Sequence, residues 1–97
     1  MEKHAKVVVI GGGVVGCSIL FHLAKFGLKD CILLERNELT SGSSWHAAGS
    51  VHAISSDPNI SKLMAYTIKL YKVIEETSGH AVGVKPRGGF YLASNPV

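Results

Sequence analysis

The chain has 97 residues, 46% of them hydrophobic, and a formal net charge of +3, a size that accommodates one domain. Its lysines and arginines are scattered rather than clustered, which argues against nucleic-acid binding. The apolar runs are too short for a transmembrane helix, and the first residues resemble neither a signal peptide nor a transit segment. We therefore expect a cytoplasmic protein, with the mitochondrial matrix as the alternative.

The first predicted element is a β-branched strand over residues 6–10, followed by a glycine-rich turn over residues 11–16. An apolar pattern with helical spacing continues to residue 26 and ends at Gly27. A second apolar strand over residues 31–34 ends in Glu35. Strand, glycine turn, helix and strand together predict an α/β, Rossmann-like βαβ unit that binds the ADP half of a dinucleotide.

Each part of the turn has a predicted task. Gly11 lets the chain turn sharply off the strand, and Gly13 leaves room for a pyrophosphate to approach the backbone. Gly16 lets the helix pack closely on the sheet. Val14 and Val15 begin the helix, whose free N–H groups and positive dipole end face the phosphates.

Glu35 follows Gly16 at close to the ~20 residues expected for the acid that accepts hydrogen bonds from the adenosine ribose. A carboxylate there also repels a 2′-phosphate, which disfavours an NADP-type ligand. Arg36 is predicted to lie along the adenine, with a solvated side chain as the alternative. A P-loop is excluded because Cys17 follows Gly16 where that motif needs lysine. The remaining alternative is a glycine-rich turn that binds no ligand.

Small and hydroxyl residues dominate from residue 37 to residue 56, and we interpret this stretch as a ligand-contacting loop. A long amphipathic helix is predicted next, with Asp57 as N-cap, Pro58 at its first position and Gly79 at its end. Short strands are expected over residues 82–84 and 90–93. Because a two-stranded sheet leaves open edges, we expect residues 1–97 to be the N-terminal part of a larger dinucleotide-binding domain that is incomplete at its C-terminal end.

Residues 6–36 resemble the nucleotide-binding start of the FAD-dependent amine oxidoreductases of the D-amino-acid-oxidase superfamily. The segment 39–49, which reads Leu-Thr-Ser-Gly-Ser-Ser-Trp-His-Ala-Ala-Gly, is similar to the dimethylglycine and sarcosine dehydrogenase branch of that superfamily. Parts of the long helix and residues 89–93 resemble the same branch. The resemblance covers essentially the whole chain and implies FAD as the cofactor.

The histidine of the Trp-His-Ala-Ala-Gly motif in this branch bonds covalently to the 8α-methyl carbon of the flavin, and by resemblance that residue is His46. Ser43 and Ser44 are implied to hydrogen-bond the pyrophosphate or the ribityl chain. Ala48 and Gly49 complete the same cofactor loop. From the residues alone, a His46 that only hydrogen-bonds within its loop is the alternative. The histidines show no metal-ligand spacing.

The resemblance implies oxidation of a small N-methylated amino acid of the dimethylglycine or sarcosine type. A hydride passes to flavin N5, and the resulting iminium is hydrolysed. An electron-transfer flavoprotein is a candidate partner, and the residues that bind the amine substrate are expected beyond Val97. The alternatives are a D-amino-acid or glycine oxidase with non-covalent FAD, a non-catalytic regulatory relative, and an isolated chain that folds poorly and has no activity.

Overall fold

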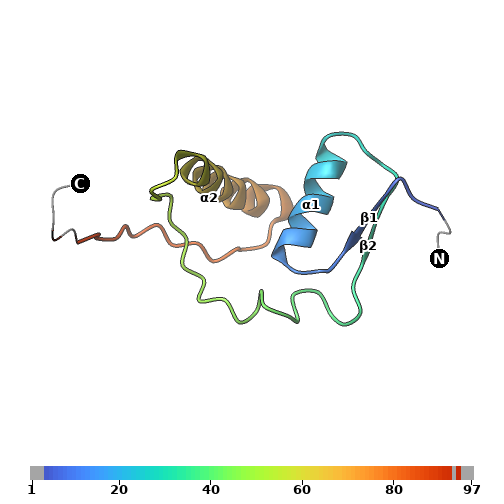
Figure 1. The fold of residues 1–97 in the computed structure, drawn as a ribbon, viewed down its shortest axis with the longest axis horizontal. Helices are drawn as coiled ribbons and strands as arrows, with labels where there is room; N and C mark the ends of the chain where they lie inside the picture. Colours follow the sequence, from blue (N-terminus) through green and yellow to red (C-terminus); the bar gives the residue numbers. More distant parts are fainter. Residues whose placement is uncertain (1–3, 93, 95–97) are drawn as a thin grey trace. The chain divides into compact units, whose positions relative to one another are not determined.

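The computed structural model describes residues 4–92 and 94 (Figure 1). The chain divides into two compact units, Met1–Ala48 and Gly49–Val97, and each is described by itself. In the described part of the chain, no helix is both long enough and apolar enough to cross a bilayer.

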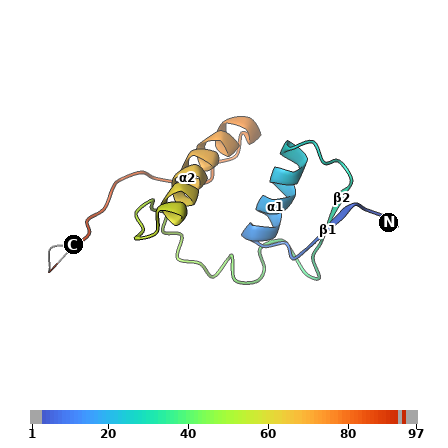
Figure 2. The ribbon, with the colours of Figure 1, turned by 45° about the horizontal axis from the view of Figure 1, so that its top comes forward.

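The first unit contains strand β1 (Val7–Ile10), helix α1 (Val14–Lys25) and strand β2 (Cys31–Leu34). The two strands pair in parallel, with Val9 opposite Leu33. Parallel neighbours need a crossover connection, which α1 provides, and Figure 2 shows α1 lying beside the two strands. Val9 is the buried apolar side chain of the described residues, at 8% exposure. The predicted βαβ unit is confirmed, with its helix ending one residue earlier than expected.

The second unit contains one long helix, α2 (Pro58–Ser78). The Asp57 carboxylate accepts hydrogen bonds from the backbone N–H groups of Asn59 at 2.7 Å and Ile60 at 3.2 Å, which satisfies two free donors of the first turn. Gly79 ends the helix in the left-handed conformation, with φ of 72°, where a glycine carries no Cβ penalty. Both predicted ends of this helix are confirmed.

The Asp57 cap carries a stability prediction. Asp57→Ala removes the acceptor for both N–H groups, and we expect it to cost about 1 kcal/mol of unfolding free energy. Asp57→Asn keeps an acceptor oxygen and should stay within a few tenths of a kcal/mol of wild type. Urea unfolding of the two variants in the complete natural protein measures the difference, and equal losses for both would show that the cap does not stabilise α2.

The two short strands predicted after α2 are not formed. Residues 82–84 and 90–92 have no regular structure, and Ala93, the last residue of the second predicted strand, lies outside the described residues. A strand needs a neighbour to accept its ladder hydrogen bonds, and no described segment pairs with these residues. The N–H groups of Val82 and Gly83 donate instead to Oε1 of Glu75, at 2.7 and 3.2 Å.

Large apolar side chains remain exposed in both units, among them Ile10 at 86%, Phe26 at 82% and Phe90 at 100%. Parallel sheets are ordinarily covered on both faces by other elements. This exposure agrees with the expectation that residues 1–97 belong to a larger domain, which stays a prediction.

Candidate cofactor site

The turn after β1 depends on glycine at two positions. Gly11 has φ of +110°, a region that L side chains rarely adopt, and its N–H still donates to the Leu34 carbonyl at 2.8 Å. A Cβ on Gly16 would overlap the Gly11 carbonyl oxygen and touch the Val9 side chain. The start of α1 therefore approaches the turn only because residue 16 has no side chain.

Glu35 is fixed against this turn by both of its carboxylate oxygens. Oε2 accepts a 2.7 Å hydrogen bond from the buried Gly12 N–H, and Oε1 accepts one of 3.1 Å from the Asn37 N–H. The Asn37 bond, followed by the Gly12 bond, lowers the pKa of the Glu35 carboxyl, and Arg36 adds a favourable charge. The carboxyl is therefore an anion at neutral pH, held at the carboxyl end of β2.

The loop after β2 returns to the start of α1. Ser44 Oγ accepts a 2.8 Å hydrogen bond from the Val14 N–H, and a Cβ on Gly13 would come within 3.0 Å of the same oxygen. A second bond, 2.8 Å from the Thr40 N–H to the Gly12 carbonyl, ties the loop to the turn. The first turn of α1 carries no acidic residue, so its positive end remains suited to an anion.

His46 is held by a backbone carbonyl of its own loop. Its Nδ1 lies 2.9 Å from the Gly42 carbonyl oxygen, and the Trp45 ring centroid lies 4.5 Å from that of the imidazole. A carbonyl oxygen only accepts, so Nδ1 carries the proton in the neutral ring and Nε2 keeps its lone pair. The imidazole is exposed, and its Nε2 has the electron pair that a nucleophile needs.

No side-chain hydrogen bond to the glycine turn is found for the other predicted site residues that the structure describes. Val15, Arg36, Ser43 and Ala48 belong to the first unit and are exposed, whereas Gly49 belongs to the second unit. The sequence patterns predicted no role for Gly12 or Thr40, although both form hydrogen bonds within the site. The central position of Gly12 in a run of three glycines was a usable signal, but the sequence holds no local signal for Thr40.

Among the described residues, no group of three potential ligands lies close enough to hold a metal ion.

Residues 6–97 match the family model described as FAD dependent oxidoreductase (DAO). The chain belongs to this family. Its βαβ unit is the Rossmann-like, FAD-binding unit of the DAO family, so the fold predicted from the glycine turn and the identification of the family are both confirmed.

Three curated relatives show where in the family the chain lies. It is 48% identical to human mitochondrial dimethylglycine dehydrogenase, over 99% of this chain and 11% of that protein. It is 44% identical to human mitochondrial sarcosine dehydrogenase, over 98% of this chain and 10% of that protein. It is 36% identical to the mouse mitochondrial pyruvate dehydrogenase phosphatase regulatory subunit, over 96% of this chain and 11% of that protein. The chain thus spans about a tenth of the length of these relatives.

Proposed function

We propose that this chain supplies the FAD-binding segment of an enzyme that oxidises a small N-methylated amino acid of the dimethylglycine or sarcosine type. The observation that carries the cofactor assignment is the ionised Glu35 carboxylate, which is bonded to the Gly12 N–H at the carboxyl end of two parallel strands. Ligands of open parallel sheets bind at this end of the strands. The substrate class is supported by the two dehydrogenase relatives.

The residues of the first unit suit the ADP half of FAD. Glu35 has lone pairs left to accept hydrogen bonds from the ribose hydroxyls. Ser44 accepts from Val14 and has one proton left to donate to a phosphate oxygen, and the Val15 N–H lies in the same first turn. When bound, FAD supplies the acceptor for a hydride from the carbon beside the substrate nitrogen.

We further propose that the flavin is attached covalently to His46. The support is the resemblance of the surrounding motif together with the Gly42 carbonyl, which leaves Nε2 as the nucleophilic nitrogen. A covalent link would keep the cofactor in place. The cytoplasmic location expected from the sequence stays a prediction, as does the electron-transfer flavoprotein as electron acceptor.

Acid precipitation of the complete natural protein tests the attachment. We expect yellow absorbance to stay with wild-type protein, to map to the peptide that contains His46, and to be lost completely in His46→Ala. His52→Ala is the matched control, because His52 is also an exposed loop histidine whose Nδ1 is bonded to a backbone carbonyl. If wild-type protein releases all its flavin in acid, covalent attachment is wrong and non-covalent FAD binding remains.

Anaerobic flavin reduction tests the substrate. We expect dimethylglycine or sarcosine to bleach the flavin absorbance of the complete protein. A second candidate function, a regulatory role without amine oxidation, is favoured by the likeness to the phosphatase regulatory subunit. A flavin that no N-methylated amino acid bleaches would support that second candidate and contradict the first.

A further inference from the structure

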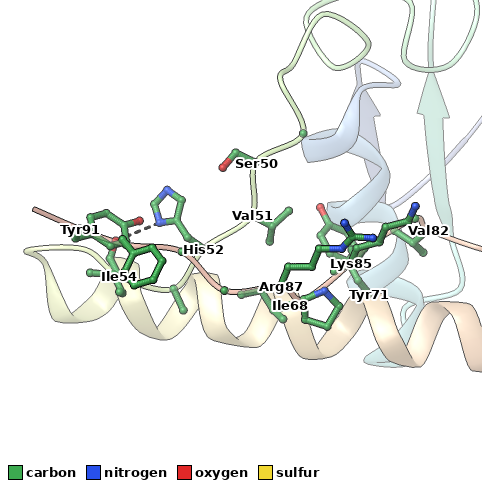
Figure 3. A pocket seen from close by; sticks show the side chains of 18 residues that line it. Ser50, Val51, His52, Ile54, Ile68, Tyr71, Val82, Lys85, Arg87 and Tyr91 are labelled. Carbon is green, nitrogen blue, oxygen red and sulfur yellow. Dashed lines mark hydrogen bonds between the residues drawn. The ribbon is translucent and has the colours of Figure 1, made fainter.

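A cavity of about 660 Å³ lies within the second unit. It is bounded by residues 49–54, by one face of α2 and by the segment 82–91, as Figure 3 shows. Small-molecule sites have volumes of roughly 300–1,000 Å³. Of the residues predicted to contact FAD, only Gly49 lines this cavity, so its other lining residues have no role in the predicted FAD site.

One end of the cavity is basic. Lys85 and Arg87 both line the cavity, at the end opposite to Tyr91 in Figure 3. None of the described lining residues is acidic. The nearby Glu75 carboxylate does not line the cavity, and its Oε1 accepts hydrogen bonds from the Val82 and Gly83 N–H groups. The two cations therefore attract an anion, and charge-assisted hydrogen bonds would hold it.

The other end of the cavity is aromatic. The His52 and Tyr91 rings meet edge to face, with centroids 6.2 Å apart and planes at 68°. His52 Nδ1 is also bonded to the Ile54 carbonyl at 3.2 Å, which fixes the imidazole, and the Ile54 side chain lies beside the two rings (Figure 3). Such a surface favours a planar, apolar group.

We propose that this cavity binds an organic carboxylate with a planar apolar body. Arg87 and Lys85 hold the carboxylate, and His52 and Tyr91 contact the body. The proposal stands independently of the proposed amine oxidation, because none of these four residues belongs to the cofactor site. Two kinds of ligand fit this description: an amino acid that the enzyme oxidises, and a carboxylate that has no amine and is not oxidised.

Calorimetric titration of the complete natural protein with 3-phenylpropanoate tests the proposal. We expect saturable binding that weakens with ionic strength, and at least about tenfold weaker binding of the neutral 3-phenylpropanamide. Arg87→Gln should weaken 3-phenylpropanoate binding about tenfold, and Lys85→Gln should weaken it less. Tyr91→Ala should weaken 3-phenylpropanoate but leave the weaker binding of propanoate unchanged. Lys72→Gln is the matched control, since Lys72 is an exposed cation of α2 outside the cavity.

The flavin content of each variant separates this proposal from the proposed function. Wild-type flavin content shows that the variant is folded, and Arg87→Lys, which keeps the charge, should recover part of the affinity. Flavin bleaching by N-methylphenylalanine, lost in Arg87→Gln, would assign the cavity to the substrate. Binding without bleaching would assign it to a carboxylate that is not oxidised. The proposal is overturned if 3-phenylpropanoate does not bind, if the amide binds equally well, or if both glutamine variants bind like wild type.

Discussion

Gly16→Ala is expected to destabilise the complete natural protein by about 3 kcal/mol and to abolish FAD binding. The new Cβ would overlap the Gly11 carbonyl oxygen, which is a backbone atom and cannot rotate away. Relief requires α1 to move off the turn, which would also displace the Val14 N–H from Ser44. Denaturant unfolding and the flavin-to-protein ratio measure the two effects.

Gly42→Ala is the matched control for Gly16→Ala. Gly42 lies in the loop of the same unit, its φ is not positive, and a Cβ there would meet no heavy atom within 4 Å. Alanine also keeps the backbone carbonyl that bonds His46 Nδ1. We expect its stability to stay within about 0.5 kcal/mol of wild type and its flavin content to be unchanged. Equal behaviour of the two variants would show that the close approach of α1 to the turn is not needed.

Glu35→Gln is expected to weaken FAD binding about 10- to 100-fold, because hydrogen bonds to a charged acceptor are replaced by weaker ones. An amide side chain also has only one acceptor oxygen for the N–H groups of Gly12 and Asn37, so one of them loses its partner. The affinity is best measured by flavin fluorescence in the His46→Ala background, where flavin exchange does not depend on a covalent bond.

Glu38→Gln controls for the loss of one negative charge in the same loop, since Glu38 is exposed and no described residue bonds its carboxylate. It should bind FAD like the parent protein. If Glu38→Gln and Glu35→Gln weaken FAD equally, long-range charge rather than the fixed Glu35 carboxylate would explain the effect.

The lowered pKa of Glu35 predicts a pH dependence. The folded-state pKa lies below the ordinary value of 4.5, so the carboxylate contributes stability that is fully present above that value. This contribution is lost as pH falls through the folded-state pKa, where the folded protein also takes up the proton. The stability difference between wild type and Glu35→Gln should therefore be constant near neutral pH and shrink in acid.

Local patterns in the sequence predicted the elements that local forces determine. The glycine turn, the helix that follows it and the capped ends of α2 depend on residues close together in the chain, such as Asp57 with Asn59 and Ile60. The same locality explains the failure at residues 82–84 and 90–92. Their composition favours strands, but strand formation depends on a partner segment, and Glu75 binds the Val82 and Gly83 N–H groups instead.

The sequence by itself determined the βαβ unit and the position of its acidic residue, because these follow from spacing and residue type, and the family followed from the resemblance of its motifs to known proteins. Only the tertiary structure decided how the site is assembled. Ser44 reaches the Val14 N–H across 30 residues, and Glu35 reaches the Gly12 N–H across 23. Such pairings depend on how the chain closes its loops in three dimensions, and no short-range pattern encodes which hydroxyl or carboxylate arrives at which backbone donor.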